Sequence, residues 1–372
     1  MSEQEVATRE RSAPSYGARA PAKVNHGSET LSIPPSSARH RTRENDGMNT
    51  ALKPRLTRYA DGITAVDVEY IRPGAAAAHI IEHAHRAAFV DTGTMHSVPY
   101  LLAALEELGI ERAAVDFVFL THVHLDHAGG AGALMQALPN ARAVLHPRGA
   151  VHLIDPAKLI AASIDVYGEA VYRRLYGEIV PLPKERVLVT KDLERMNLAG
   201  RPFEFVHTPG HAVHHHAIVD LEHSGIFTGD TFGLSYREMD TAKGAFVLPA
   251  TPPSQFDPQQ LLQSVDRLAA YAPRYLYLMH YGRVTDVPRL AQDLKHQIRE
   301  FERIALEHAQ SADPAGAIGA ALRGLWRELA RRHGCDFTDA EFHDMLDKDV
   351  NLNVQGLIAW LERRKKTQGR AQ

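Results

Sequence analysis

An α/β fold followed by a helical region is predicted by three features of the sequence. Short apolar or alternating runs, the pattern of β-strands, recur from about residue 55, with helix-like segments between them. Several of these runs end directly at a histidine or an aspartate. The sequence after about residue 288 has only helical spacing. We therefore expect a leader over residues 1–47, an α/β domain over 48–287 and a helical region over 288–372.

Residues 1–47 are rich in Ser, Pro, Arg, Glu and Ala and lack periodic apolar residues, so we expect a disordered leader. Met48, directly after it, is a candidate translation start. The N-terminus has no apolar core of the secretory type. The sequence contains no run of about 18 apolar residues, which a membrane-spanning helix would need. A cytoplasmic protein without membrane association is therefore expected.

The composition indicates an ordinary soluble globular protein. Its 372 residues are 44% apolar and 23% charged, and the formal net charge is −3. Because there is no global basic field, we expect a small-molecule partner rather than nucleic acid or an anionic membrane. The single cysteine, Cys335, excludes a disulfide within the chain and a cysteine-based zinc site, and its place in the helical tail makes it a poor nucleophile.

Glycine, proline and charged residues separate the expected elements of the first half. Val98–Leu108 has helical spacing, and Gly109 is placed to end that helix. Ala114–Thr121 is an apolar run typical of buried strands, and it leads directly into His122. The remaining elements expected in this half are strands over Ile63–Ile71, His79–His83, Ala87–Asp91 and Ala143–His146 and a helix over Gly130–Leu138.

A helical insertion is expected over residues 155–180, where Tyr167, Tyr172 and Tyr176 recur at roughly helical spacing and are expected to pack in the core. The strands expected after it are Phe203–His207, Ala217–Asp220, Gly225–Thr228 and Tyr275–Met279. The helices expected after it are Gln259–Ala270, Leu290–Ala309, Ala315–Arg332, Asp339–Leu346 and Val354–Lys365.

The strongest chemical signal is the segment THVHLDHAGG at residues 121–130. It holds four metal-competent side chains directly after an apolar strand. Residues two apart in an extended stretch face the same side, so His122 and His124 can bind one ion together. Asp126 and His127 lie just past the turn and can reach a second ion beside the first. Such crowded groups repel or compete unless a cation binds them, so a metal site is indicated.

Three weaker signals follow in order along the chain. His211 comes after a Pro-Gly turn at the end of one predicted strand. Asp230 follows the next strand and a glycine, and His280 stands at the end of a later strand. Each signal alone is weak. All of them place a carboxylate or an imidazole at a strand terminus, and their joint occurrence supports the metal site.

Together these motifs resemble the metallo-β-lactamase superfamily: HxHxDH, a histidine after TPG, then GD and a late histidine. The TPGH element is most similar to that of the glyoxalase II-like hydrolases, and the resemblance covers roughly residues 56–285. It implies a four-layer αβ/βα sandwich with the site at one edge between two β-sheets. The implied ligands of one ion are His122, His124 and His211. The implied ligands of the other are Asp126, His127 and His280, with Asp230 bridging the two.

Asp91, in the segment VDTG, matches the aspartate that often braces the metal loop in this family, and we expect it beside the ligands rather than among them. Many relatives read TPGHTxGH, whereas this chain reads TPGHAVHH. His214 replaces the glycine, and His215 falls on the second histidine of the motif. The sequence leaves open whether His214, His215 and His216 shape the site, bind substrate or simply pack.

The resemblance implies a hydrolase with two divalent ions, zinc being favoured, although iron and manganese suit the same nitrogen and oxygen ligands. The ions share a water molecule and lower its pKa, and the resulting hydroxide attacks a carbonyl carbon or a phosphorus atom. Asp126 or Asp230 takes and returns the proton. The expected substrate is an ester, a thioester or a lactone.

An iron-dependent oxidoreductase of the same fold is the main alternative. A flavodiiron-like enzyme typically has a glutamate where this chain has His124, and it needs a flavin domain, of which the C-terminal region shows no pattern. A persulfide dioxygenase-like enzyme uses a single iron with the same motif. A nuclease would show a basic surface, and a scaffold without catalysis would have lost ligands, so both are disfavoured.

Three segments are candidates for the walls of a substrate pocket: residues 167–176, Phe232–Tyr236 and the proline-rich loop Phe246–Phe256. Tyr236 and Tyr281 stand where a hydroxyl could meet a substrate oxygen, although packing is the expected role of each. The C-terminal helices are expected to cover the site or to mediate self-association.

Overall fold

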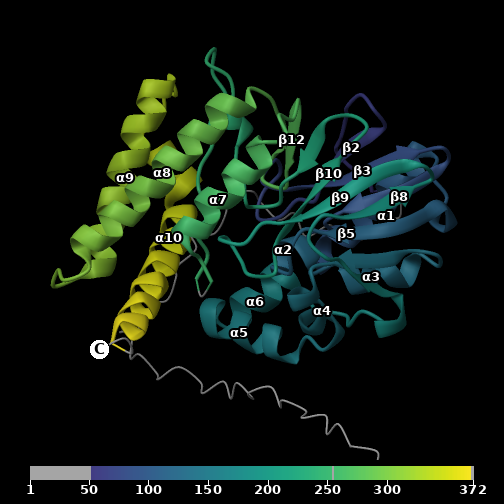
Figure 1. Cartoon of the computed structure of the whole chain (residues 1–372), viewed down its shortest axis with the longest axis horizontal. Coiled ribbons are helices and arrows are strands. Elements are labelled where there is room, and N and C mark those ends of the chain that lie inside the picture. The colour runs from purple at the N-terminus through teal and green to yellow at the C-terminus, as the bar shows by residue number, and fades with distance from the viewer. Residues whose placement is uncertain (1–51, 254, 370–372) are drawn as a thin grey trace, which may run out of the picture. The chain divides into compact units, whose positions relative to one another are not determined.

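The computed structural model describes residues 52–253 and 255–369, and the structural statements below concern these residues. The expected leader and Met48 lie outside the described residues. Two β-sheets, with helices on both outer sides, make up the fold (Figure 1). Within the described ranges, no helix combines the length and the apolar character needed to cross a membrane.

The first sheet contains seven strands, which lie side by side in their order along the chain. They are β1 (Leu56–Arg58), β2 (Ile63–Asp67), β3 (Ala77–His83), β4 (Arg86–Val90), β5 (Val115–Leu120), β6 (Arg142–Leu145) and β7 (Val187–Val189). Strands β1 to β4 pair antiparallel as a meander, and β4 to β7 pair in parallel. Residues of β2 are buried on both faces, as expected for a sheet that is covered on both sides.

The second sheet contains six strands in the order β13-β12-β11-β10-β9-β8. They are β8 (Glu194–Leu198), β9 (Arg201–His207), β10 (His216–Asp220), β11 (Gly225–Phe227), β12 (Tyr275–Leu278) and β13 (Gly282–Val284). Only β11 and β12 pair in parallel among them. The expected strands are therefore present, and β1, β7, β8 and β13 are strands that were not predicted from the sequence.

Helices connect and cover the sheets. They are α1 (Val98–Leu108), α2 (Leu125–Ala128), α3 (Ala131–Ala137), α4 (Pro147–Ile154), α5 (Ala157–Tyr167), α6 (Glu169–Tyr176), α7 (Pro258–Ala269), α8 (Val287–His308), α9 (Pro314–His333) and α10 (Asp339–Gln368). Short 3-10 turns occur at Met95–Ser97, Arg112–Ala114, Lys184–Arg186 and Arg237–Met239. Helix α1 ends at Gly109 as expected, where a left-handed φ of 70° favours glycine.

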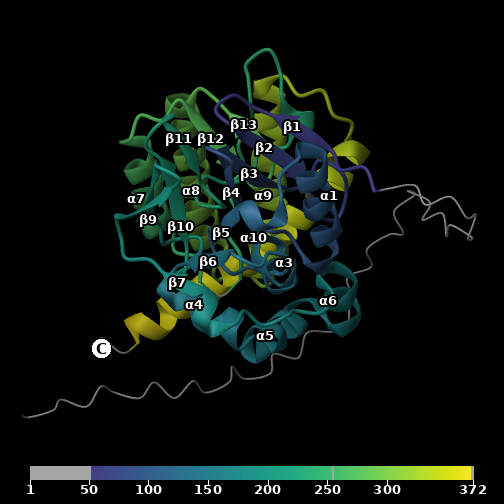
Figure 2. The ribbon, with the colours of Figure 1, turned by 90° about the vertical axis from the view of Figure 1, so that its right-hand side faces the viewer.

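Four layers can be followed in Figure 2, from α7 and α8 across the two sheets to α1 and α3. Leu101 of α1 and Leu134 of α3 share a core with the outer face of the first sheet. Aromatic side chains of both sheets, among them Phe119 and Phe205, fill the space between the sheets, with ring centroids 5.3 Å apart. The predicted four-layer αβ/βα sandwich is confirmed.

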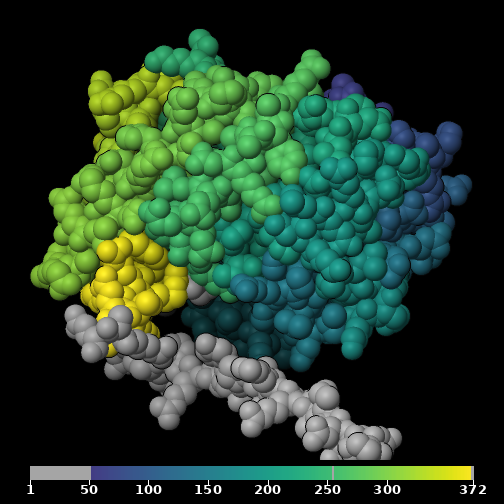
Figure 3. All heavy atoms as spheres, viewed as in Figure 1, coloured from purple at the N-terminus to yellow at the C-terminus, as the bar shows by residue number. Residues whose placement is uncertain are grey.

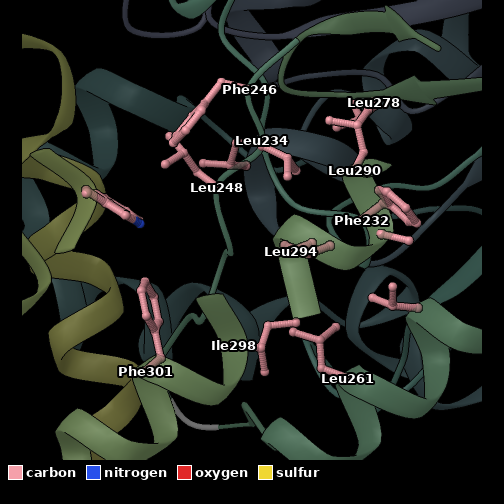
Figure 4. Packing of buried hydrophobic residues seen from close by; sticks show 14 of the residues in the cluster. Phe232, Leu234, Phe246, Leu248, Leu261, Leu278, Leu290, Leu294, Ile298 and Phe301 are labelled. Carbon is pink, nitrogen blue, oxygen red and sulfur yellow. The ribbon is translucent and has the colours of Figure 1, made fainter. Parts of the chain in front are cut away.

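Helices α7 to α10 cover the second sheet and share one core with it. Figure 4 shows Leu290, Leu294 and Ile298 of α8 facing apolar side chains of the segment 232–248 and of α7. In Figure 3 the green and yellow atoms of these helices adjoin the teal atoms of the α/β part. The helical C-terminal region is confirmed, and the domain boundary at residue 287 stays a prediction.

The two helices expected over Asp339–Leu346 and Val354–Lys365 are one helix, α10. The expected break was wrong because Asn353, a weak helix former by itself, is fixed by contacts outside the helix. Its buried side-chain Oδ1 accepts hydrogen bonds from the backbone N–H and the hydroxyl of Thr251, at 2.7 and 2.6 Å. Helix α10 is thereby attached to the loop that the sequence analysis placed at the pocket.

Candidate metal centre

The candidate ligands leave the sheets from neighbouring strand ends. His122 and His124 follow β5, and the single turn α2 carries Asp126 and His127. The other three donors come from the second sheet: His211 follows β9, Asp230 follows β11 and His280 follows β12. Because these ends meet at one edge of the sandwich, donors more than 150 positions apart in the sequence lie within contact distance.

Side chains that could hold a metal ion form three overlapping groups, in each of which the ligand atoms lie within 4.8 Å of one another. The groups are His122, His124 and His211; His122, His127 and Asp230; and Asp126, His127 and His280. In the first group, Nδ1 of His124 lies 2.8 Å from Nε2 of His122 and 3.1 Å from Nε2 of His211. The structure thus brings together all seven residues that the resemblance implies as ligands.

Asp230 lies between the two outer groups. Its Oδ2 is 3.5 Å from Nε2 of His211, and its Oδ1 is 3.3 Å from Nε2 of His127 and 3.9 Å from Nε2 of His280. Asp126 closes the second group, with Oδ2 3.4 Å from Nε2 of His280. One oxygen of Asp230 therefore faces each group, which is the arrangement that a bridging carboxylate requires.

Two buried atoms at the middle of this cluster lack a hydrogen-bond partner among the described residues. They are Nε2 of His127 and Oδ1 of Asp230, whose side chains are 0% and 9% exposed. They lie 3.3 Å from each other without forming a hydrogen bond, and because buried polar atoms are nearly always satisfied, both are open to a partner other than protein. Imidazole nitrogens and carboxylate oxygens are ligands that divalent metals accept, so the residues present fit a pair of metal ions.

Burial and neighbouring charges set the protonation of the cluster. Burial lowers the pKa of His122 well below its ordinary value and that of His124 to about 3, so both imidazoles are neutral and able to bind metal. Burial opposes ionisation of Asp126, but His127 and His280 outweigh it and lower the pKa of Asp126 to about 2. The same balance, with His127 dominant, holds the pKa of Asp230 well below its ordinary value. Both carboxylates are therefore ionised.

The ring nitrogens on the far side of the ligands are fixed by the protein. Asp91 accepts hydrogen bonds from the Thr121 backbone N–H at 2.8 Å and from Nδ1 of His127 at 2.9 Å. Nδ1 of His211 donates to the carbonyl of Ala250 at 3.0 Å, and Nδ1 of His280 donates to that of Ala75 at 2.9 Å. In each case Nε2 is left facing the cluster, as is usual where a second hydrogen bond orients a metal-binding histidine.

The three histidines that the sequence left open have different surroundings. Nε2 of His215 accepts a hydrogen bond from the backbone N–H of Asp230 at 3.2 Å, so His215 braces the loop that carries this carboxylate. His216 is buried away from the cluster, where its Nε2 donates to the carbonyl of Leu120 at 2.9 Å. His214 is buried, borders the cavity, and has no partner at Nδ1 among the described residues. Only the brace by His215 had a signal in the sequence, its place on the second histidine of the motif.

A cavity of about 360 Å³ opens beside the cluster, and His124, Asp126, His211, Asp230 and His280 border it. All three segments expected as walls contribute to it. The segment 167–176 supplies Tyr167 and Tyr176, and the segment Phe232–Tyr236 supplies Leu234 and Tyr236. The loop Phe246–Phe256 supplies residues 250–253 and Gln255. Tyr281 is not among the lining residues. The C-terminal helices were expected to cover the site or to mediate self-association, and α10 does border the cavity, but its lining residues were not predicted: Asp344, Met345, Lys348, Asp349, Leu352 and Asn353.

The tyrosines of the insertion were expected to pack in the core. Tyr172 and Tyr176 are buried in a small apolar cluster with Leu125, apart from the main cores. Tyr167 and Tyr176 also border the cavity, so for these two residues packing and cavity lining occur together.

Comparisons with known proteins agree with this geometry. A metallo-beta-lactamase fold-containing protein of Sulfurisphaera tokodaii is 27% identical over 213 residues, 56% of this chain and 74% of that protein. The hydroxyacylglutathione hydrolase of Aeromonas hydrophila is 29% identical over 153 residues, 41% of this chain and 44% of that protein. This chain therefore matches less than half of the length of that hydrolase.

Two solved structures share the fold over most of their length. An archaeal metallo-beta-lactamase superfamily protein from Sulfolobus tokodaii has a TM-score of 0.57 and 22% identity, covering 80% of this chain and 99% of its own. A family member from Thermus thermophilus has the same TM-score and identity, covering 84% and 92%. The model of the metallo-beta-lactamase superfamily matches residues 71–280, more than half of the chain and the whole span of the seven donors. The chain belongs to the metallo-β-lactamase superfamily.

Proposed function

We propose that this protein is a metal-dependent hydrolase that acts on a carboxylic ester, a thioester or a lactone. The observation that carries the proposal is the shared carboxylate: Asp230 faces both donor groups, and both groups border one cavity. A pair of donor groups joined by one carboxylate, beside a space for a small molecule, is what a dinuclear hydrolytic site needs.

In this proposal His122, His124 and His211 would hold one ion, Asp126, His127 and His280 would hold the other, and Asp230 would contribute a ligand to both. When bound, two divalent ions lower the pKa of a water molecule and polarise the substrate oxygen. We assign proton transfer to Asp126 because its side chain is 21% exposed and borders the cavity, whereas that of Asp230 is 9% exposed. Zinc is the metal that we propose, and it is favoured by the family resemblance, because the nitrogen and oxygen donors suit iron and manganese as well.

The relatives support a hydrolase without fixing its substrate. The hydroxyacylglutathione hydrolases are named for the hydrolysis of a glutathione conjugate, and this chain matches less than half of their length. Their substrate is therefore not carried over to this chain. The general reaction class, attack of activated water on an activated carbonyl, is what we retain from them.

Metal analysis of the purified full-length chain, combined with a panel of esters, thioesters and lactones, tests the proposal. We expect about two metal equivalents per chain, and we expect Asp230→Ala to lose metal and activity together. Asp336→Ala, at an exposed loop position, is the control and should keep both. Normal hydrolysis by the Asp230→Ala protein would show that the bridge is wrongly assigned. One equivalent of iron with no hydrolysis would favour the iron-dependent oxidoreductase instead.

A further inference from the structure

Two side-chain amides on the cavity wall each have their oxygen bound to a backbone N–H. Oδ1 of Asn353, on α10, accepts hydrogen bonds from the N–H and the hydroxyl of Thr251 at 2.7 and 2.6 Å. Oε1 of Gln255, in the loop before α7, accepts from the N–H of Val213 at 3.1 Å. A backbone N–H can only donate, so these contacts decide which end of each amide is the oxygen. The NH2 groups therefore point away from these anchors.

The NH2 groups of both amides are left unused by the protein. Neither donates a hydrogen bond to another residue in 52–253 or 255–369, and neither is enclosed, whereas the unpartnered Nδ1 of His214 is. Asn353 and Gln255 both border the cavity. Because Asn353 is only 2% exposed, the open space beside its NH2 group is the cavity itself. A buried amide with a free donor at a cavity wall is a hydrogen-bonding position for a ligand.

Other polar groups of the wall are already bound to one another. The hydroxyls of Tyr70 and Tyr176 lie 3.2 Å apart, and the Tyr236 hydroxyl donates to Asp349 at 3.3 Å. These groups offer a ligand less than the two amides do, since binding them would break an existing hydrogen bond. The amides are thus fixed donors in a wall that is otherwise satisfied or apolar at these positions.

The exposed charges of the wall have both signs. Lys158 on α5 and Lys348 and Asp344 on α10 border the cavity, and all three are exposed. Water hydrates and screens such charges, so they do not require a ligand of either sign. The enclosed amides favour an uncharged acceptor, because two neutral donors do not offset the cost of desolvating a carboxylate.

Both amides are anchored beside His211, one of the candidate ligands. Val213 follows His211 by two residues, so their Cα atoms are at most about 7 Å apart. Thr251 follows Ala250, whose carbonyl accepts the hydrogen bond from Nδ1 of His211 at 3.0 Å. A small molecule at the metal centre therefore has these donors within reach of a short side group.

We infer that the NH2 groups of Asn353 and Gln255 bind an uncharged carbonyl oxygen of the substrate, that of a ketone or an amide, apart from the carbonyl that is hydrolysed. This inference rests on the proposed function, because it adds a recognition group to the substrate of that hydrolase. The substrate class is then an ester or thioester with a second carbonyl a few bonds from the first. The position of the amides does not select the acyl side or the leaving side, so the test covers both.

Two pairs of thioesters, matched in length and branching, test the inference with the metal-loaded full-length protein. Levulinoyl and isocaproyl thioesters of ethanethiol have a ketone or a methyl branch on the acyl side. Acetyl thioesters of N-acetylcysteamine and isohexanethiol have an amide or a methyl branch on the thiol side. We expect kcat/KM to be about tenfold higher for the carbonyl member of one pair. Equal values within both pairs would overturn the inference.

Carboxylate variants remove the donors and keep the anchors. Asn353→Asp retains an oxygen for Thr251 and replaces the NH2 group by a second oxygen, and Gln255→Glu does the same for Val213. Each should reduce the tenfold preference to about twofold or less. Asn351→Asp is the control, because Asn351 lies on the same helix, accepts through Oδ1 from Arg323 and does not line the cavity.

The readout is the ratio within a pair, which a merely structural effect would not change. A preference that survives in either variant would refute the share of that residue. Thermal melting checks that each variant folds. If the buried charge of Asn353→Asp prevents folding, Gln255→Glu decides the outcome, because Gln255 is only partly buried.

A succinyl thioester of ethanethiol tests the role of charge. It carries a carboxylate where the levulinoyl group has its ketone, and we expect a lower kcat/KM for it than for the levulinoyl thioester. A preference for the succinyl group that is lost in Lys158→Met or Lys348→Met would transfer recognition to these lysines and overturn the inference.

Calorimetry with the free acids separates this inference from the hydrolase proposal. If no thioester is hydrolysed, but levulinate binds more tightly than isocaproate and Asn353→Asp loses this difference, the donors are correct and the hydrolase is wrong. If thioesters are hydrolysed at equal rates within both pairs, the hydrolase stands and the amide donors are refuted.

Discussion

Replacing Asn353 with alanine should weaken the fold and loosen the candidate metal centre together. Asn353 lies on α10 and is 2% exposed, as is Thr251, whose backbone N–H and hydroxyl it binds. Helix and loop are in close contact here, since a Cβ atom at Gly356 would lie 1.8 Å from the carbonyl oxygen of Thr251. The Thr251 hydroxyl also lies 3.3 Å from the backbone carbonyl of Asn353, an acceptor that an alanine variant keeps, so the group that loses its acceptor is the Thr251 N–H.

The magnitude follows from the two hydrogen bonds. The hydroxyl can turn to the backbone carbonyl of Asn353, whereas leaving the buried N–H of Thr251 without an acceptor costs about 1–3 kcal/mol. We therefore expect Asn353→Ala to lower the free energy of unfolding by about 1–3 kcal/mol. The residue before Thr251 is Ala250, whose carbonyl accepts the hydrogen bond from Nδ1 of His211. A loosened loop should therefore also weaken metal binding, by about tenfold, as loss of an orienting partner does.

Urea denaturation of the chelator-treated protein measures the first effect, and competition with a metal-binding dye measures the second. Asn351→Ala is the matched control, because Asn351 lies on the same helix and, among residues 52–253 and 255–369, its side chain accepts a single long hydrogen bond, 3.5 Å, from Arg323. We expect the control to change stability by less than about 0.5 kcal/mol. An Asn353→Ala protein as stable as the control would refute the link between α10 and the loop. A destabilised protein with unchanged metal affinity would refute its extension to His211.

Two further variants test charges around the centre. Burial raises the pKa of Asp349 from 3.8 to about 6. The folded metal-free protein therefore holds this proton more tightly than the unfolded chain does. The stability that the protonated group contributes is lost as pH rises from about 4 through 6. Asp349→Asn should therefore gain melting temperature relative to wild type between pH 4 and pH 8; parallel curves for the two proteins would contradict this. Asp91→Asn removes the carboxylate that accepts from Thr121 and His127, and should weaken metal binding by about 10–100-fold in the same dye assay, whereas unchanged affinity would show that Asp91 does not brace the centre.

The parts of the fold that the sequence predicted are those dictated by local pattern. Apolar runs such as Val115–Leu120 have the length and composition of buried strands, and the helix Val98–Leu108 ends where a glycine accepts a left-handed φ. Strand β8, ERMNL, was missed because only one of its five residues is buried, so that its charged residues hide the alternation. Its pairing with β9 is decided by neighbouring backbone rather than by its own composition.

The same limit applies to the site. The donors at 122–127 are close in sequence and could be recognised from spacing alone, whereas the convergence of His211, Asp230 and His280 on them was expected only from a family resemblance. The C-terminal helices were expected near the site, but which residues of α10 line the cavity had no local signal, because Met345 and Leu352 have the pattern of ordinary core positions of a helix. The packing of α10 against its neighbours decides which of its faces meets a core and which meets a cavity. The residue pattern of the helix alone does not show this packing.

The order of the donors along the chain has a consequence for synthesis. The segment 122–127 is synthesised early. Each three-donor group also needs one residue that follows a strand of the second sheet: His211, Asp230 or His280. A nascent chain that ends before β9 therefore exposes four crowded metal-competent side chains with no complete group. Ions that load this centre would do so after both sheets have met, and from then on each bound ion would join one half of the sandwich to the other.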